Sequence, residues 1–219
     1  GRFEKQRLRR VAATSERHLP FGSYMASGDV PLHPAMDVPS QRRKDIENLY
    51  DFYNALDGPN WLRQDGWPHY QYHDPYTPKR NIYEHHAHDM HGVLCKLFTK
   101  HMLEIRLVRN HLSGPFPNKV IGDMLHLEKI DITDNDVSGY LEDYTFGRLK
   151  NMHVICLHGN RIKGRIPAGG LMRLEFLQEL TLSKNCLTGS IPKSLDNCQN
   201  LTHLRLFSNR LTGHIPESL

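Results

Sequence analysis

LTLSKNCLTGSIP (residues 180–192) and LRLFSNRLTGHIP (residues 204–216) are two copies of one pattern, and this pattern decides the fold. Working outward from them, five copies can be aligned on an asparagine that recurs every 24 or 25 residues. In each copy, apolar residues stand eight, five and three residues before the asparagine and two and six residues after it, and a glycine follows at four. Self-similarity at such a period indicates a repeat architecture. The asparagines are Asn110, Asn135, Asn160, Asn185 and Asn209.

Each position of the pattern has a physical role. The alternating apolar residues are expected to point inward from a short strand. Each asparagine is expected to bond backbone groups left open where the chain leaves the strand, because buried N–H and C=O groups need partners. We call these five residues the asparagine ladder. The glycine permits a backbone conformation that a side chain would obstruct. One unit cannot bury its apolar face alone, so stacked units should share one core.

The frame L-x-x-L-x-L-x-x-N-x-L-x-G-x-I-P, which covers about residues 92–219, resembles the leucine-rich repeats of the plant type. Such repeats occur in receptor ectodomains and polygalacturonase inhibitors. The resemblance implies an α/β solenoid of about five repeats that binds other proteins and does not catalyse a reaction. No nucleophile motif, phosphate loop or kinase signature was found, and no cofactor is expected.

Residues 40–56 are predicted to form a helix that caps the repeats. Ser40 can serve as its N-cap, and residues 57–59, Asp-Gly-Pro, should end it. The following segment with Trp61 and Trp67 resembles the N-terminal cap of many leucine-rich-repeat proteins, and HGVLC at residues 91–95 resembles the first strand of that cap. The apolar face at helical spacing consists of Ile46, Leu49, Tyr50, Tyr53 and Leu56.

Three regions are therefore expected: an extended basic arm (1–39), the cap helix with a polar loop (40–91), and the repeats (92–219). Residues 1–45 hold nine of the 28 Lys and Arg residues and five of the 24 Asp and Glu residues, which accounts for the whole net charge of +4. The arm is expected to pack along a neighbouring subunit; RNA contact and a leftover mitochondrial targeting segment are the alternatives. Its cations are Arg2, Lys5, Arg7, Arg9, Arg10 and Arg17.

The four cysteines, Cys95, Cys156, Cys186 and Cys198, match no zinc motif and no dense disulfide framework. We interpret them as free thiols, which favours a reducing compartment. In the secreted plant proteins that the cap resembles, a second cysteine shortly upstream pairs with the counterpart of Cys95. No cysteine precedes Cys95 in this chain.

The candidate binding site is the concave face that the resemblance implies. The residues around the inward apolar pair of each strand should face solvent there, and their mixed charges favour a polar protein partner. The alternative is that they are solvated strand residues and that binding uses an edge, the loop or the arm. From the first repeat to the fifth, the residues are Glu104, Arg106, Val108 and Arg109; Lys129, Asp131, Thr133 and Asp134; Val154, Cys156, His158 and Gly159; Glu179, Thr181, Ser183 and Lys184; His203, Arg205, Phe207 and Ser208.

The histidine cluster in EHHAHDMH, residues 84–91, is a candidate metal site. Histidine nitrogens are good zinc ligands, and a carboxylate could add an oxygen. No matching half-site exists elsewhere in the sequence, so we expect a polar loop and no metal. The residues concerned are His85, His86, His88, Asp89 and His91.

Three functions remain open from sequence. The leading hypothesis is an accessory subunit of an intracellular assembly, with mitochondria or another organelle as candidate locations and other protein subunits as partners. It rests on the long arm, the missing cap disulfide, and a last repeat without a polar terminal cap, whose end should be covered by a partner or by sequence beyond Leu219. The first alternative is a fragment of an extracellular receptor- or inhibitor-type protein. Asn200-Leu201-Thr202, the one N-glycosylation acceptor in the chain, is compatible with it. The second alternative is a ribonucleoprotein subunit whose arm contacts RNA.

Overall fold

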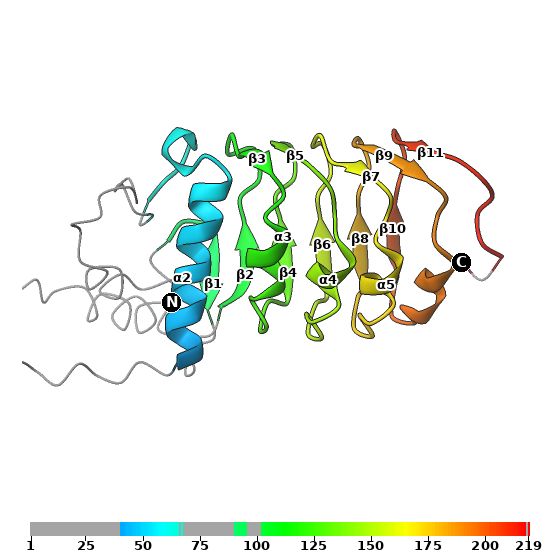
Figure 1. The fold of residues 1–219 in the computed structure, drawn as a ribbon, viewed down its shortest axis with the longest axis horizontal. Coiled ribbons are helices and arrows are strands. Elements are labelled where there is room, and N and C mark those ends of the chain that lie inside the picture. Colours follow the sequence, from blue (N-terminus) through cyan, green and yellow to red (C-terminus); the bar gives the residue numbers. More distant parts are fainter. Residues whose placement is uncertain (1–39, 66, 68–89, 96–101, 218) are drawn as a thin grey trace, which may run out of the picture. The chain divides into compact units, whose positions relative to one another are not determined.

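The computed structural model describes residues 40–65, 67, 90–95, 102–217 and 219. The arm predicted for residues 1–39 and most of the polar loop, residues 68–89, lie outside these ranges. Within them, helices and short strands alternate along a stack of similar units, which Figure 1 shows from the cap helix at one end to the last repeat at the other. No helix of this described part is long and apolar enough to cross a membrane.

The main sheet contains one strand from the cap and one from each repeat, in the order β1-β2-β4-β6-β8-β10. The repeat strands are parallel and in register, so that Ile105 lies beside Ile130, Ile130 beside Ile155, and Leu180 beside both Ile155 and Leu204. The cap strand pairs antiparallel with its neighbour. The bounds are Val93–Cys95 (β1), Met102–Arg106 (β2), Lys129–Asp131 (β4), Val154–Cys156 (β6), Glu179–Thr181 (β8) and His203–Arg205 (β10).

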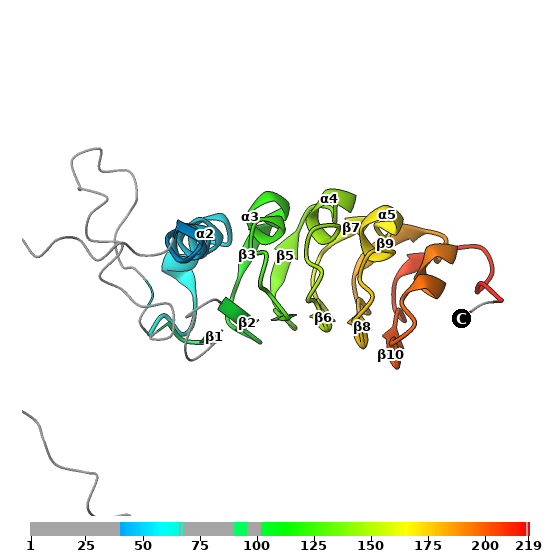
Figure 2. The ribbon, with the colours of Figure 1, turned by 90° about the horizontal axis from the view of Figure 1, so that it is seen from below.

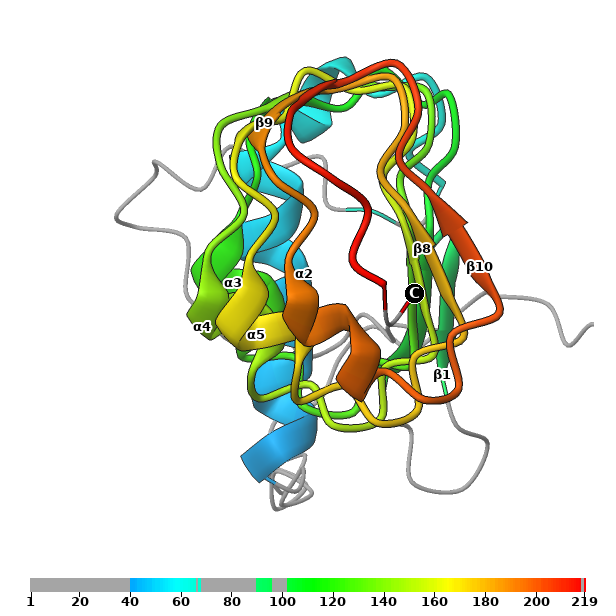
Figure 3. The same cartoon turned by 90° about the vertical axis from the view of Figure 1, so that its right-hand side faces the viewer.

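Helical turns cover the opposite side of the core, and smaller sheets join the two sides. Viewed along the stack, the main sheet and the helical turns form two opposite walls (Figure 3), and the buried apolar side chains belong to the core that they enclose. The turns are α3 (Asn118–Gly122), α4 (Asp143–Phe146), α5 (Ala168–Leu171) and the 3-10 helix η4 (Lys193–Asn197). The small sheets contain β3 (Ser113–Pro115) with β5 (Asp136–Ser138), and β7 (Lys163–Gly164) with β9 (Cys186–Gly189) and β11 (Arg210–Leu211).

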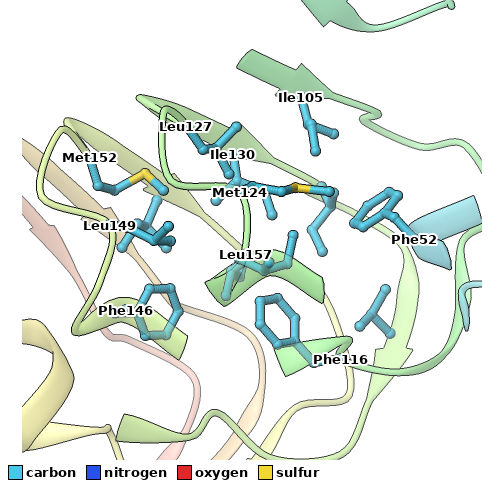
Figure 4. Packing of buried hydrophobic residues seen from close by; sticks show 14 of the residues in the cluster. Phe52, Ile105, Phe116, Met124, Leu127, Ile130, Phe146, Leu149, Met152 and Leu157 are labelled. Carbon is cyan, nitrogen blue, oxygen red and sulfur yellow. The ribbon is translucent and has the colours of Figure 1, made fainter. Parts of the chain in front are cut away.

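One apolar core runs through the cap and the repeats. The inward residues of the strands, such as Ile130 and Leu157, are fully buried, and Figure 4 shows them facing aromatic rings from the helical side, Phe116 and Phe146. Each buried leucine or isoleucine stabilises the fold by about 1.5–3 kcal/mol relative to an exposed one. Figure 2 shows the same units from the edge, with helical turns on one side and strands on the other. The core therefore extends by one layer with each repeat.

The asparagine ladder supplies hydrogen bonds that the sheet does not. The Asn135 side-chain oxygen accepts the backbone N–H groups of Asn110 (2.9 Å) and Leu112 (3.0 Å). Its amide nitrogen donates to the carbonyls of Leu107 and Ile132, both at 2.8 Å. Each ladder asparagine after the first thus joins its own repeat to the preceding one. Asn160, Asn185 and Asn209 make the same two donor bonds, and their side-chain oxygens accept one backbone N–H group each, from Val137, Ile162 and Leu187.

The residue before each ladder asparagine has a left-handed backbone. A positive φ strains a residue with a side chain, and only the third repeat has glycine there. The strain is tolerated because the strand-to-strand hydrogen bonds continue through this residue: the Asp134 N–H, for example, donates to the His158 carbonyl at 2.8 Å. The turned backbone directs the following asparagine into the core. The φ values are 51° at Arg109, 54° at Asp134, 65° at Gly159, 51° at Lys184 and 55° at Ser208.

The cap helix α2 spans Ser40–Ala55, which confirms the predicted helix to within one residue. Asp57 then turns the chain with a left-handed φ of 59°. Trp61 and Trp67 are buried, with ring centroids 4.9 Å apart, and the Trp67 ring stacks on that of Tyr53 at 5.7 Å. Both indole N–H groups donate to backbone carbonyls, at 2.6 Å to Leu56 and 2.9 Å to His91. The cap is therefore held by stacked aromatic rings and hydrogen bonds.

The first ladder residue ties this cap to the repeats. The Asn110 side-chain oxygen accepts the Arg63 N–H at 2.7 Å, and its amide donates to the Arg63 carbonyl at 3.1 Å. At the other end of the stack, Leu204 and Leu206 are only half-buried, whereas the equivalent Leu180 and Leu182 are buried. Leu180 and Leu182 are covered by repeats on both sides. Leu204 and Leu206 are more exposed because their repeat has a neighbouring repeat on one side in this structure.

Candidate functional site

The concave face consists of side chains that stand in rows across the parallel strands. Residues at alternate strand positions point to the same side, and the register places equivalent residues of adjacent repeats next to each other. The first row contains Glu104, Lys129, Val154, Glu179 and His203, and the second contains Arg106, Asp131, Cys156, Thr181 and Arg205. Residues that are 25 positions apart in the sequence thus become direct neighbours.

The charged residues of these rows pair with one another across the strands. Lys129 Nζ lies 3.0 Å from Glu104 Oε1, and Arg106 Nε lies 3.9 Å from Asp131 Oδ2. At the other end of the face, Arg205 Nη1 lies 2.8 Å from Glu179 Oε1. Partly exposed pairs of this kind contribute little to stability. Their charges remain accessible to a partner that offers better placed opposite charges.

A polar cluster continues the face toward the side on which the asparagine ladder lies. Asp134 accepts from Arg109 Nε at 3.0 Å, and its second oxygen lies 3.8 Å from His158 Nε2. The other ring nitrogen of His158 lies 2.7 Å from Ser183 Oγ. Phe207 is 56% exposed, with its ring centroid 6.0 Å from that of His158. This cluster brings together one residue from each of the five repeats, and two of these residues, His158 and Phe207, carry rings.

Two residues that the sequence placed on the solvent side are buried. Thr181 is 6% exposed and Ser183 is fully buried. Thr181 Oγ1 donates to Glu179 Oε1 at 3.1 Å, and Ser183 is bonded by the His158 ring. Longer side chains of neighbouring strands cover these short ones, so the solvent-facing position of Thr181 and Ser183 was predicted wrongly. They can support a binding face only by positioning their neighbours.

Cys156 lies at the centre of the second row and is half-buried. Burial, followed by the nearby carboxylates of Glu179 and Asp131, raises the pKa of its thiol to about 12. A thiol with so high a pKa is protonated at neutral pH, and only the thiolate is a strong nucleophile. The Cys156 thiol is therefore uncharged and a weak nucleophile at neutral pH. None of the four cysteines, which all lie in the described part of the chain, forms a disulfide.

A hollow of about 480 Å³ at the cap end of the face was not anticipated from the sequence. Its apolar lining residues are Val93, Leu94 and Val108, of which Leu94 and Val108 are 55% and 37% exposed. The signal that could have found it is Leu94, an apolar residue at an outward position of the cap strand. The hollow is lined by His91, Gly92, Val93, Leu94, Glu104, Arg106 and Val108.

Two further predicted sites fall on residues that the structure does not describe. The six cations of the arm belong to residues 1–39, and the metal candidates His85, His86, His88 and Asp89 belong to residues 68–89. His91 is described and lies in the hollow at the cap end. Within the described ranges, no group of three or more His, Cys, Asp or Glu side chains is placed to hold a metal ion.

Comparisons with known proteins agree with this geometry. The family model described as Leucine Rich Repeat matches residues 176–198 and 200–219. Among solved structures, the chain is similar to a protein in the crystal structure of the BIR3–SERK2 complex from Arabidopsis thaliana, with 28% identity, a TM-score of 0.68, and coverage of 80% of this chain and 87% of that chain. A Pollen Receptor Kinase 3 structure has 26% identity, a TM-score of 0.58, and coverage of 78% and 74%. The BIR2 ectodomain from Arabidopsis thaliana, at 24% identity, a TM-score of 0.65 and coverage of 80% and 84%, shares the fold. A search of curated proteins found no match to the sequence.

A stack of units that presents an open parallel sheet, with its helical turns behind, defines a solenoid of the kind that serves as a protein-interaction module. More narrowly, the chain is a leucine-rich-repeat protein with repeats of the plant type.

Proposed function

We propose that this protein is an extracellular recognition module of receptor type, which binds a polar protein or peptide on its concave face. The observation that carries the proposal is the pair of rows on β2 to β10, where charges of both signs reach solvent and form ion pairs between neighbouring strands. A partner with complementary charges can exchange these internal pairs for intermolecular ones, which favours specificity and fast association. The face is short, so we expect a partner segment of limited length.

The extracellular assignment is supported by the relatives above 25% identity. One is part of a complex between two proteins, BIR3 and SERK2, and another is a receptor kinase. These comparisons favour the first alternative from the sequence over the intracellular accessory subunit. The missing cap disulfide is a weaker argument for the intracellular hypothesis, because the rings of Tyr53, Trp61 and Trp67 pack on one another, edge to face and stacked, and hold the cap together.

The accessible ends of the face are the best place to test binding. Arg106 and Arg205 lie in the second row, and their side chains are 66% and 48% exposed. Reversing both charges, Arg106→Glu and Arg205→Glu, places them beside Asp131 and Glu179 and creates repulsion where the partner would bind. The matched control is Lys163→Glu with Arg210→Glu, two exposed cations of the small sheet β7-β9-β11. Both double variants change the net charge equally.

The experiment compares proteins that the secreted wild-type chain and the two double variants retain from an extracellular extract, by quantitative mass spectrometry. We expect a defined protein or peptide to bind the wild type and the control equally and the concave variant at least about tenfold more weakly, a loss of about 1.4 kcal/mol. Titration of that partner then gives the affinity. Equal binding by the concave variant, or selective loss in the control, would show that the partner uses another surface.

A further inference from the structure

The acceptor sequence Asn200-Leu201-Thr202 lies in the turn between η4 and β10, and both Asn200 and Thr202 are exposed. Asn200 stands nine residues before the ladder residue Asn209, as Phe176 stands nine residues before Asn185. The two residues therefore occupy equivalent positions in adjacent repeats. The side-chain amide of Asn200 donates to the Glu175 carbonyl at 2.6 Å, which is the peptide carbonyl bonded to the nitrogen of Phe176.

Phe176 is an exposed aromatic residue beside this asparagine. Its side chain is 51% exposed, and the ring packs on His153 of the preceding repeat with centroids 6.0 Å apart and planes at 24°. Asn200 belongs to the following repeat. An aromatic ring that is covered on the side of one repeat and open elsewhere offers an apolar surface, and the C–H groups of a sugar ring pack well on the negative face of an aromatic ring.

We propose that Asn200 is an N-glycosylation site whose first N-acetylglucosamine rests on the ring of Phe176. The proposal depends on the extracellular location given under the proposed function, because the modification occurs in the secretory pathway. In the reaction, Nδ2 of Asn200 forms a bond to the anomeric carbon of a lipid-diphosphate-linked oligosaccharide. The anomeric C–O bond breaks, the lipid diphosphate leaves with the bonding electrons, and one Nδ2 proton passes to a base of the transferase.

The folded structure accommodates the product. The glycosylated amide keeps one N–H, so it can still donate to the Glu175 carbonyl. Thr202 Oγ1 donates to the Gln178 carbonyl at 3.1 Å and fixes the turn to the preceding repeat. Thr202 Oγ1 also lies 2.9 Å from Nδ1 of His203, the last residue of the first concave row. A glycan at this edge therefore borders the row that ends at His203 and leaves the opposite side of the face, with Arg109, Asp134 and Lys184, open to a partner.

The occupancy test uses the full chain secreted from insect cells behind an added secretion signal. Intact mass and peptide mapping after deglycosylation in H₂¹⁸O identify the modified residue. Thr202→Ala removes the acceptor but keeps Asn200 and its bond to Glu175, and Thr202→Ser is the matched control that keeps the acceptor. We expect a glycan on Asn200 in the wild type and in Thr202→Ser and none in Thr202→Ala. A secreted wild-type chain with unmodified Asn200 overturns the proposal.

The contact between the first N-acetylglucosamine and the Phe176 ring is tested by measuring melting temperatures. The difference in Tm between Thr202→Ser and Thr202→Ala is measured for secreted protein and for bacterial protein, in which both variants lack sugar. We expect the secreted pair to differ by about 2 °C more than the bacterial pair, and this excess should vanish when Phe176→Ala is added. An excess that survives Phe176→Ala refutes the contact.

A failure of the glycosylation proposal can be distinguished from a failure of the proposed binding function. Partner capture by the concave face is compared between wild type and Arg106→Glu with Arg205→Glu in the same secreted preparations. Glycan on Asn200 without selective partner capture leaves the modification site standing and removes the binding site. Selective partner capture without a glycan on Asn200 supports the binding site and removes the modification site.

Discussion

Replacing Asn135 by alanine should be among the most damaging single changes in the repeats. The substitution removes the partner of two backbone N–H groups, those of Asn110 and Leu112, and of the carbonyls of Leu107 and Ile132. Asn135 is only 8% exposed, so water cannot replace it freely. A buried polar group left without a partner costs about 1–3 kcal/mol. With two N–H groups affected, we expect a loss of roughly 3–5 kcal/mol, even if the carbonyls find other donors.

The assay is thermal and urea unfolding followed by circular dichroism. For a chain of this size each kcal/mol lowers Tm by about 2–4 °C, so Asn135→Ala should lower it by roughly 6–20 °C. Asn151→Ala is the matched control, because Asn151 is exposed and lies outside the ladder; it should change stability by less than about 0.5 kcal/mol. Asn209→Ala should fall between them, since its hydrogen bonds are only part-buried. Equal effects of Asn135→Ala and Asn151→Ala would refute the reasoning.

Three further predictions follow from the same structure. Gly114→Ala should destabilise the protein by about 1–3 kcal/mol in urea titrations, because φ is 112° and a Cβ would lie 2.5 Å from the Ala55 carbonyl oxygen of the cap helix; a neutral result would mean that the cap and the first repeat can separate freely. Cys156 should react with iodoacetamide at pH 8 at least about tenfold more slowly than a thiol of pKa 9, because burial and nearby carboxylates raise the pKa of its thiol to about 12 and leave little thiolate. Its labelling rate should rise with each pH unit above 9 and match that of the other cysteines in urea, and a plateau near pH 9 would contradict the raised pKa. Glu104→Ala should change the free energy of unfolding by less than about 1 kcal/mol, because its ion pair with Lys129 is partly exposed; a loss of several kcal/mol would show that this pair is structural.

The asparagine-centred pattern was enough to predict the solenoid, because five aligned copies leave few other ways to bury Ile105, Ile130 and their equivalents. The cap helix and its tryptophans were also predictable, since helical spacing and the Asp-Gly-Pro stop are local signals. The burial of Thr181 and Ser183 was not predictable in this way. Their short side chains are covered by residues about 25 positions away in the sequence. The alternation of apolar and polar residues within one strand does not show how long the side chains of the adjacent strand are.

The concave site shows the same division. The sequence indicated which residues face outward, but it did not show that Glu104 pairs with Lys129, Arg106 with Asp131 and Glu179 with Arg205. The hollow beside Leu94 and Val108 was also hidden, because β1 is antiparallel to β2 and its register includes an irregularity between Leu94 and Cys95.

The sequence by itself therefore determined the repeat, its period and the identity of the inward residues, because these follow from hydrophobic alternation and from the hydrogen-bonding needs of the backbone within one unit. The tertiary structure decided which charged residues form ion pairs and which short side chains are buried beneath their neighbours. It also decided that Phe176 and Asn200 lie side by side at one edge. The physical reason is stacking: placing repeats in register turns a separation of about 25 residues along the chain into direct contact, and the character of the surface depends on that contact.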